Sequence, residues 1–163
     1  MQSHGPQFKW MTSQVIERKS SMKNIPEFSW IGCMHEGIPV ATENLDACIK
    51  FYTEVLGLNI LSRPKTLDEF GPGAWLGDKD DTVQFHLIAN DECPIPGEEA
   101  QIDPMSRHTA WKIKDVDAFR DRLSALKIEF KEITGLLGTP QIFVLDPQGF
   151  TWEFQGSSYR DSF

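Results

Sequence analysis

The stretch RHTAWKIKDVDAF at 107–119 places His108 at the start of a predicted strand, just before a predicted helix. A histidine there is either a hydrogen-bonded core residue or a metal ligand. Other residues of suitable chemistry are His35, His86 and Glu153. Imidazoles and a carboxylate together suit Fe(II), Mn(II), Ni(II) or Zn(II) and leave positions open for a substrate. The bound ion would act as a Lewis acid toward a substrate with two adjacent oxygens.

These side chains can meet only if the chain repeats a structural unit, and the sequence indicates such a repeat. In the first unit a predicted strand at 30–40 leads into a predicted helical stretch at 42–58, where apolar residues recur at helical spacing. The second unit repeats this order, with a strand at 108–114 and a helix at 115–127. Three short predicted strands follow each helix, at 58–63, 73–77 and 82–89 in the first unit and at 128–133, 139–146 and 150–155 in the second.

Short signals set the boundaries of these elements. Thr42 or Asn44 is the predicted cap of the first helix, Gly57 its stop, and Asp115 the cap of the second helix. The sequence DPQG at 146–149 predicts a turn, with proline second and glycine fourth, that makes a hairpin of the last two strands. We therefore expect an α+β fold in which two tandem βαβββ modules form a curved mixed sheet around a central cavity. The modules span 28–90 and 107–156, and 91–106 is the linker between them.

Strand alternation predicts which side chains face the cavity, because successive side chains of a strand point to opposite faces. The predicted cavity side holds His35, Gln84, His86, His108, Lys112 and Glu153. The predicted helix side holds Met34, Ile38, Val40, Phe85, Trp111, Trp152 and Phe154. Two histidines and a carboxylate at equivalent positions of two repeated units favour a ligand set over isolated core residues.

Length and composition point to one soluble globular domain with a small-molecule partner. The chain has 163 residues, of which 40% are hydrophobic, and no apolar run approaches the roughly 20 residues that span a bilayer. The net charge of -8 disfavours nucleic acid and anionic membranes as partners. The three cysteines are widely spaced and form no CxxC pair, which indicates a reducing compartment, so we expect a cytoplasmic protein.

The two ends of the chain differ from the modules. Residues 1–27 are rich in serine and basic residues and show little periodicity, so we expect a flexible N-terminal tail. A weak organellar transit peptide is the alternative interpretation of this stretch. Residues 157–163 form the predicted C-terminal tail.

Three separate motifs resemble the vicinal oxygen chelate superfamily, which is the glyoxalase/bleomycin resistance protein/dioxygenase fold. HEGIPVATENLDACIKFYTEVLGL at 35–58 is similar to the opening strand and FY-x-x-x-LG helix of that family. HTAWKIKDVDAF at 108–119 resembles its second opening strand, and IFVLDPQGFTWEF at 142–154 resembles its closing DP-x-G hairpin. The motifs appear in order, and the resemblance covers about 28–156. GAWL and FHLI at 73–76 and 85–88 are most similar to lactoylglutathione-lyase-like proteins.

The resemblance implies a metal site and an assembly. It implies that one divalent ion, of Fe, Ni, Zn, Mn or Co, is bound by His35, His108, Glu153 and a fourth ligand. The fourth ligand is expected to be His86, with Gln84 as the alternative. It also implies a homodimer, and it leaves open whether modules pair within one chain or across the dimer.

Further roles are predicted for individual residues around that site. Glu153 is also the candidate catalytic residue, because a carboxylate can act as the base that takes a proton from the substrate. Lys112, Arg63 and Gln84 are candidate contacts to the small-molecule substrate. Lys112 is predicted on the cavity face and Arg63 follows a strand end, where an acidic substrate group could meet it.

Three functions remain open from the sequence. The first is a divalent-metal-dependent, glyoxalase-like lyase or isomerase acting on a small substrate with vicinal oxygens, which needs four protein ligands. The second is an extradiol-type Fe(II) dioxygenase, which needs only His35, His108 and Glu153. The third is a metal-free small-molecule binding protein of the bleomycin-resistance kind, in which an acidic groove holds a cationic compound.

Overall fold

The computed structural model describes residues 28–29, 32–80, 82–97, 99–134 and 139–156. The described residues from Cys33 onward belong to one compact unit. The predicted tails at 1–27 and 157–163 lie outside the described residues. In the described ranges, no helix has the length and apolar character needed to cross a bilayer.

The first module consists of one sheet and one interrupted helix. Its strands are β1 (Glu36–Val40), β2 (Asn59–Leu61), β3 (Gly73–Gly77) and β4 (Gln84–Ala89). The helix α2 (Leu45–Lys50) follows a 3₁₀ turn, η1 (Thr42–Asn44), and continues as a π-helical segment, η2 (Phe51–Val55). A second 3₁₀ segment, η3 (Lys65–Phe70), joins β2 to β3. The strand order is β1-β4-β3-β2, with β1 parallel to β4 and the other pairs antiparallel.

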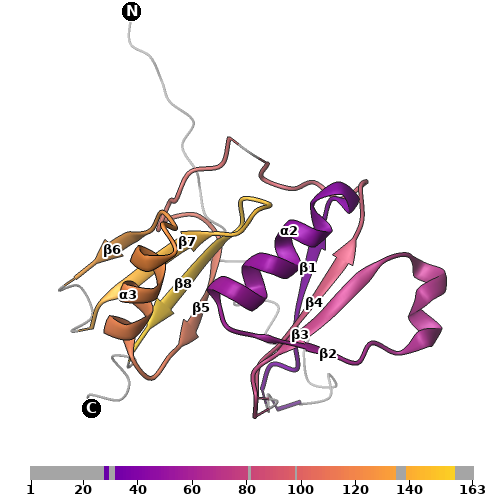
Figure 1. Cartoon of the computed structure of the whole chain (residues 1–163), viewed down its shortest axis with the longest axis horizontal. Coiled ribbons are helices and arrows are strands. Elements are labelled where there is room, and N and C mark those ends of the chain that lie inside the picture. Colours follow the sequence, from indigo (N-terminus) through magenta and orange to yellow (C-terminus); the bar gives the residue numbers. More distant parts are fainter. Residues whose placement is uncertain (1–27, 30–31, 81, 98, 135–138, 157–163) are drawn as a thin grey trace, which may run out of the picture. The chain divides into compact units, whose positions relative to one another are not determined.

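The second module repeats this arrangement (Figure 1). It contains β5 (His108–Lys112), α3 (Val116–Ala125), β6 (Lys131–Ile133), β7 (Gln141–Leu145) and β8 (Thr151–Gln155). The strand order is β5-β8-β7-β6, and β5 is parallel to β8. The predicted α+β class and the two tandem βαβββ modules are therefore confirmed, and each module has its own four-stranded mixed sheet.

Most of the predicted element boundaries are found in the structure. The carboxylate of Asp115 accepts a hydrogen bond from the backbone N–H of Ala118 at 2.8 Å and so caps α3. Gly57, which follows the first helix, has a φ of 77°, a conformation that favours glycine at a helix end. In the DPQG turn, the N–H of Gly149 donates to the carbonyl of Asp146 at 2.9 Å.

Three local predictions were wrong. Neither predicted residue caps α2 with its side chain, because the chain enters this helix through the η1 turn and the hydroxyl of Thr42 donates to Asp91 instead. Met34 was predicted on the buried side but is 88% exposed, since β1 begins only at Glu36. The second helix was predicted to extend to 127, yet α3 ends at Ala125 and Leu126 is exposed.

Both modules contribute to one hydrophobic core. Tyr52 of η2 is fully buried and lies against the rings of Phe85 and Trp152, with centroid distances of 5.5 and 6.1 Å. Phe85 of β4 also contacts Trp111 of β5 at 5.0 Å and Trp152 of β8 at 5.5 Å. The helix-covered faces of the two sheets therefore pack together through aromatic side chains.

A buried hydrogen bond crosses this core. The hydroxyl of Tyr52 donates to Oδ2 of Asp146 at 2.7 Å, where the β7–β8 turn reaches toward α2 (Figure 1). The other oxygen of Asp146 accepts the N–H groups of Gln148 and Phe150, each at 2.9 Å. Burial raises the pKa of Asp146, although these hydrogen bonds act in the opposite direction. The FY and DP-x-G motifs thus supply the two partners of one contact between modules.

Replacing Tyr52 with Phe should destabilise the protein by about 1–3 kcal/mol, because the buried carboxylate of Asp146 would lose a donor that water cannot replace. The measurement is the free energy of unfolding from urea titrations. Thr53→Val is the matched control, since the Thr53 hydroxyl donates to the carbonyls of Ile49 and Lys50 in its own helix and not to a residue of the other module among the described residues. Equal effects of the two substitutions would contradict the structural role of the Tyr52–Asp146 bond.

Candidate functional site

The candidate ligands of the first module gather on one face of its sheet. His86 of β4 stacks on His35, with ring centroids 4.0 Å apart and planes inclined by 17°. On its other side His86 stacks on Trp75 of β3, at 4.1 Å and 2°. Oε1 of Gln84 lies 3.3 Å from Nε2 of His86. We call His35, Trp75, Gln84 and His86 the first half-site.

Burial and the neighbouring His35 both lower the pKa of His86. Partial burial lowers its pKa because burial disfavours the charged ring, and His35 lowers the pKa further by charge repulsion. Both effects favour the neutral form of the His86 ring, which is the form that binds a metal ion.

The candidate ligands of the second module also gather on one face. Nε2 of His108 lies 2.8 Å from Oε2 of Glu153, whose side chain is 4% exposed. The other carboxylate oxygen of Glu153 accepts from the side-chain amides of Gln141 and Gln155, each at 2.5 Å. We call His108, Gln141, Glu153 and Gln155 the second half-site.

The backbone fixes the orientation of the His108 ring. Its Nδ1 lies 2.8 Å from the carbonyl oxygen of Ser106. Because a carbonyl only accepts, Nδ1 carries a proton and Nε2 is directed at Glu153. Nε2 of His108 and Oε2 of Glu153 are thus held 2.8 Å apart, with an imidazole nitrogen facing a carboxylate oxygen. The contact therefore pairs an imidazole with a carboxylate, two side-chain groups that can each bind a divalent cation.

The two half-sites lie on the sheet faces that turn away from the shared core. Phe85 and Leu87 are buried in the core, so His86 between them points to the opposite face. Trp152 and Phe154 flank Glu153 in the same way. In the part of the chain that the structure describes, no group of three or more His, Cys, Asp or Glu is placed to hold a metal ion. One chain thus presents two pairs of donors, and neither pair alone completes a metal site.

The predicted substrate contacts have different surroundings. Arg63 donates to the carboxylate of Asp68 at 2.7 Å and to the carbonyls of Leu67 and Gly71 at 2.7 and 2.9 Å, so its guanidinium closes the loop around η3. Lys112 is exposed at the end of β5, on the same face as His108. The roles of Arg63, Lys112 and Gln84 toward a substrate stay predictions.

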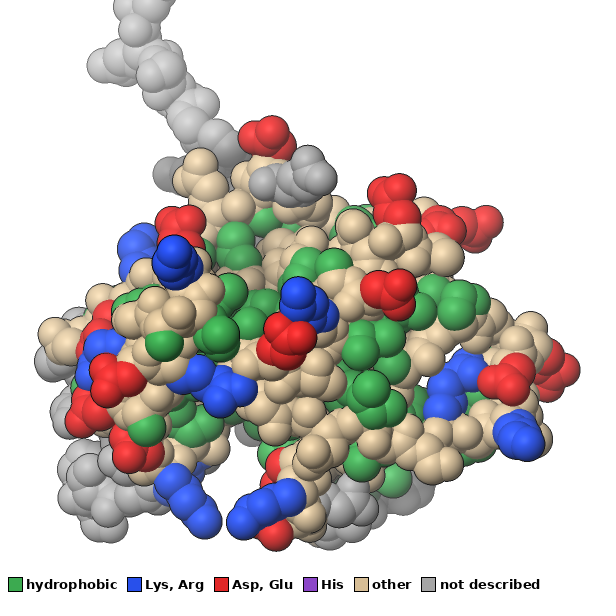
Figure 2. Space-filling view, in the orientation of Figure 1, with side chains coloured by type: hydrophobic (Ala, Val, Ile, Leu, Met, Phe, Trp, Pro, Cys, Tyr) green, Lys and Arg blue, Asp and Glu red, His purple; other side chains and the backbone are tan. Residues whose placement is uncertain are grey.

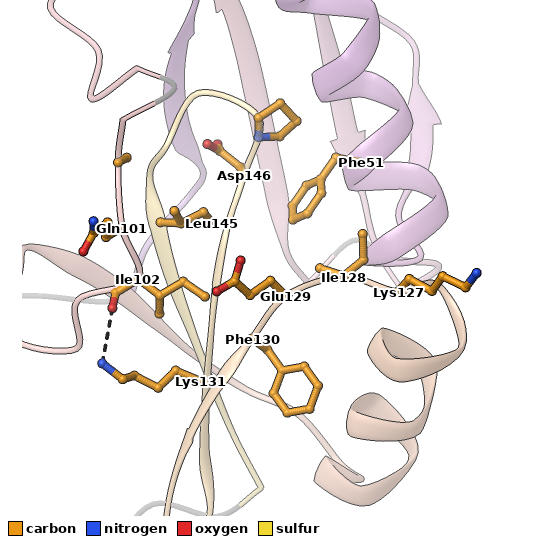
Figure 3. Close-up of a pocket in the computed structure, with 12 residues that line it drawn as sticks. Phe51, Gln101, Ile102, Lys127, Ile128, Glu129, Phe130, Lys131, Leu145 and Asp146 are labelled. Carbon is orange, nitrogen blue, oxygen red and sulfur yellow. Dashed lines mark hydrogen bonds between the residues drawn. The ribbon is translucent and has the colours of Figure 1, made fainter.

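Two cavities bear on where a small molecule could bind. The smaller, of about 300 Å³, lies between β1 and the β5–β8 pair and is lined by Arg107, His108 and Glu36, among others. The larger, of about 710 Å³, lies near the β7–β8 turn and contains none of the candidate ligands. Figure 3 shows that Glu129 and Phe51 point into this larger cavity, while Lys131 reaches aside to the carbonyl of Ile102. The smaller cavity is therefore the one adjacent to a half-site.

On the face shown in Figure 2, the acidic side chains do not gather into one patch. Figure 2 shows acidic and basic side chains interspersed with apolar and uncharged surface there. A charged substrate would have to be recognised by individual side chains on that face, because no patch of one sign covers it.

Sequence reasoning missed the partners that hold the candidate ligands. Gln141 and Gln155 share the face of Glu153 and are cross-strand neighbours of each other in the β7–β8 hairpin. The predicted DPQG turn could have given this register, and with it Gln141. Trp75 could have been found by alternation within GAWLG, in which Trp75 shares a face with Gly73 and Gly77.

Comparison with known proteins gives a family and a fold. Residues 33–154 match the family model described as "Glyoxalase/Bleomycin resistance protein/Dioxygenase superfamily". The chain is 25% identical over 119 residues to "Glyoxylase I 4" of Arabidopsis thaliana, a match over 71% of this chain. It spans 66% of the length of that relative.

Solved structures with the same fold include proteins of different kinds. One is a glyoxalase family protein from Bacillus anthracis, with a TM-score of 0.65 and 20% identity over 80% of this chain and 98% of that one. Another is TnmS3, an antibiotic binding protein from Streptomyces sp. CB03234, with a TM-score of 0.59 and 18% identity over 79% of this chain and 98% of that one. At these identities the likeness shows the fold alone.

Proposed function

Because the chain belongs to the Glyoxalase/Bleomycin resistance protein/Dioxygenase superfamily, we propose that it is a divalent-metal-dependent, glyoxalase-like enzyme. In this proposal it acts as a lyase or isomerase on a small substrate that has vicinal oxygens. The observation that supports it most is the contact between His108 and Glu153. An ordered imidazole beside a buried carboxylate has the chemistry of half a metal site.

The ring of His108 is oriented in the way that metal-binding histidines are. The carbonyl of Ser106 holds Nδ1 of His108 in the donor state, which is the arrangement that orients metal-binding histidines in proteins. Nε2 then faces a carboxylate oxygen of Glu153 at 2.8 Å. Both groups could bind the same divalent cation, because the neutral imidazole and the carboxylate each offer a lone pair. Gln141 and Gln155 would keep the carboxylate in place.

The second part of the proposal is that the site is completed between two copies of the chain. Each half-site offers two donors, and the sheet faces that carry them turn away from the core that joins the modules. A symmetric dimer would bring the first half-site of one copy to the second half-site of the other, twice. The ligands would then be His35 and His86 from one copy and His108 and Glu153 from its partner.

The residues of this site have separate chemical tasks. The ion, when bound, supplies Lewis-acid stabilisation of negative charge on a substrate oxygen. Glu153 is the proposed base, because a carboxylate in a buried site next to the substrate can take a proton from carbon. The cavity of about 300 Å³ beside His108 offers space for part of a small substrate, with Arg107 at its lining. Lys112, Arg63 and Gln84 are proposed as further substrate contacts.

One observation supports a second candidate, a metal-free binding protein. The carboxylate of Glu153 already has the His108 ring and two amide donors as partners, so the second half-site is satisfied without an ion. The fold is shared with an antibiotic binding protein, TnmS3. In this alternative the half-sites are polar networks that shape a binding surface, and no metal affinity is expected.

Metal binding separates the two candidates. Chelator-treated protein is titrated with Zn²⁺ by calorimetry, and the metal-dependent proposal predicts one ion per chain. His108→Ala should abolish binding, and His86→Ala should weaken it by at least about 10-fold, since each removes a ligand. His4→Ala, which changes a histidine outside both modules, is the control. Stoichiometric Zn²⁺ in His108→Ala would show that the ligand set is wrong, and a wild type without affinity would favour the metal-free protein.

Activity assays with two kinds of substrate distinguish the lyase or isomerase from the dioxygenase. The metal-loaded protein is supplied either with a hemithioacetal of a 2-oxoaldehyde or with a catechol and dioxygen. The proposal predicts isomerisation of the hemithioacetal, with kcat lowered at least about 100-fold by Glu153→Gln through loss of the base. Metal content is measured on the same samples, so that loss of the ion is distinguished from loss of the base. Oxygen uptake with the catechol alone would instead favour the extradiol dioxygenase.

A further inference from the structure

Three aromatic rings form a continuous stack across the first half-site. The indole of Trp75 and the imidazole of His86 are nearly parallel, at 2°, with centroids 4.1 Å apart. The imidazole of His35 stacks on the opposite side of His86, at 4.0 Å and 17°. Trp75 and His86 are cross-strand partners in the β3–β4 pair, which sets them side by side. His86 is therefore enclosed between two rings.

Such a stack prevents two imidazoles from binding one ion. The lone pair of an imidazole nitrogen lies in the plane of its ring, and an ion bound by histidine lies along it at about 2.0–2.1 Å. Rings that are nearly parallel and 4.0 Å apart direct their lone pairs into separate planes. One ion cannot lie in both planes, so one of the two rings must turn when His35 and His86 share an ion.

The surroundings of the two rings indicate which one turns. His86 lies inside β4, half-buried, with Trp75 on one face and the Gln84 amide 3.3 Å from its Nε2. His35 is exposed and precedes the first residue of β1, so its backbone is outside the sheet hydrogen-bond ladder. Moving His35 costs one ring contact, whereas moving His86 would break contacts to all three neighbours.

Trp75 does not lie on the core-facing side of its strand. It is half-exposed on the face that turns away from the core, and its two neighbours on that face of β3 are Gly73 and Gly77. The indole is thus the one large side chain that β3 contributes to this face. The indole ring stacks on the imidazole of His86.

We propose that Trp75 is a positioning residue that holds the ring of His86 in a fixed plane, and that His35 leaves the stack when the two histidines share a metal ion. This inference rests on the proposed metal-dependent function. It assigns different tasks to the two imidazoles of the first half-site. His86 is the preset ligand, and His35 is the ligand that closes on the ion.

The test follows the ring protons of the two histidines by NMR while chelator-treated, full-length protein is titrated with Zn²⁺. His35→Ala and His86→Ala variants assign the signals. In the metal-free protein, stacking shifts the ring protons of both histidines upfield. On addition of Zn²⁺ the signals of His35 should lose this shift, and those of His86 should keep the part that comes from Trp75.

Substitutions of Trp75 supply the second readout. Trp75→Ala should weaken Zn²⁺ binding about 10-fold, as loss of a residue that orients a ligand does, while Trp75→Phe keeps a ring and should stay within about 2-fold of wild type. Phe70→Ala removes a 72% exposed aromatic side chain of the same module and is the matched control. Urea unfolding of each variant separates lost folding from lost positioning.

The outcomes are distinguishable. Wild-type affinity in Trp75→Ala, or loss of the upfield shift at His86 instead of His35, would overturn the positioning role while the metal-dependent function stands. A wild type that binds no Zn²⁺ would overturn the proposed function and this inference with it. Weakened binding in Trp75→Ala, rescue in Trp75→Phe and movement of His35 alone would support the inference.

Discussion

The buried hydrogen bond from Tyr52 to Asp146 is the contact on which the arrangement of the two modules depends. Without the Tyr52 hydroxyl, Oδ2 of Asp146 would be left with the indole N–H of Trp152, 3.5 Å away, which is a costly loss in a buried core. The bond therefore favours a β7–β8 turn that stays against η2. The aromatic core around Tyr52 then joins the helix-covered faces of both sheets. The opposite faces, which carry the half-sites, are left without a partner from this core. The position of the candidate chemistry is thus a consequence of how the modules are joined.

Local sequence signals were enough to predict the elements of this fold. Alternating or periodic apolar residues located the strands and helices, while the Asp115 cap and the glycine of the DPQG turn located two of their boundaries. The errors arose where a neighbouring segment decides the local structure. Thr42 bonds to Asp91, which is far along the chain, and Met34 is exposed because the partner strand β4 does not pair with it. No local pattern contains that information.

The candidate site was predictable only in part. Alternation placed Glu153 and His108 on one face of the second sheet, and the structure brings these two into contact. The stack of His35 on His86, and the use of Arg63 to close its own loop, depend on tertiary distances that spacing does not give. The sequence also could not predict which face of one sheet packs against the other module in the same chain. Either face of a sheet can be covered by another part of a protein. The sequence left open whether the modules pair within one chain or across a dimer, and in the described residues the candidate ligands lie in two half-sites.

Complementation between two inactive chains tests most directly whether the half-sites close across a dimer. His86→Ala removes a ligand from the first half-site, and Glu153→Gln removes one from the second. Neither variant alone should bind Zn²⁺ as the wild type does. If the site forms between copies, an equimolar mixture that is unfolded and refolded together should regain about a quarter of the wild-type Zn²⁺ sites, because half of the dimers are mixed and each has one intact site. A mixture that binds no more Zn²⁺ than the separate variants would contradict the account.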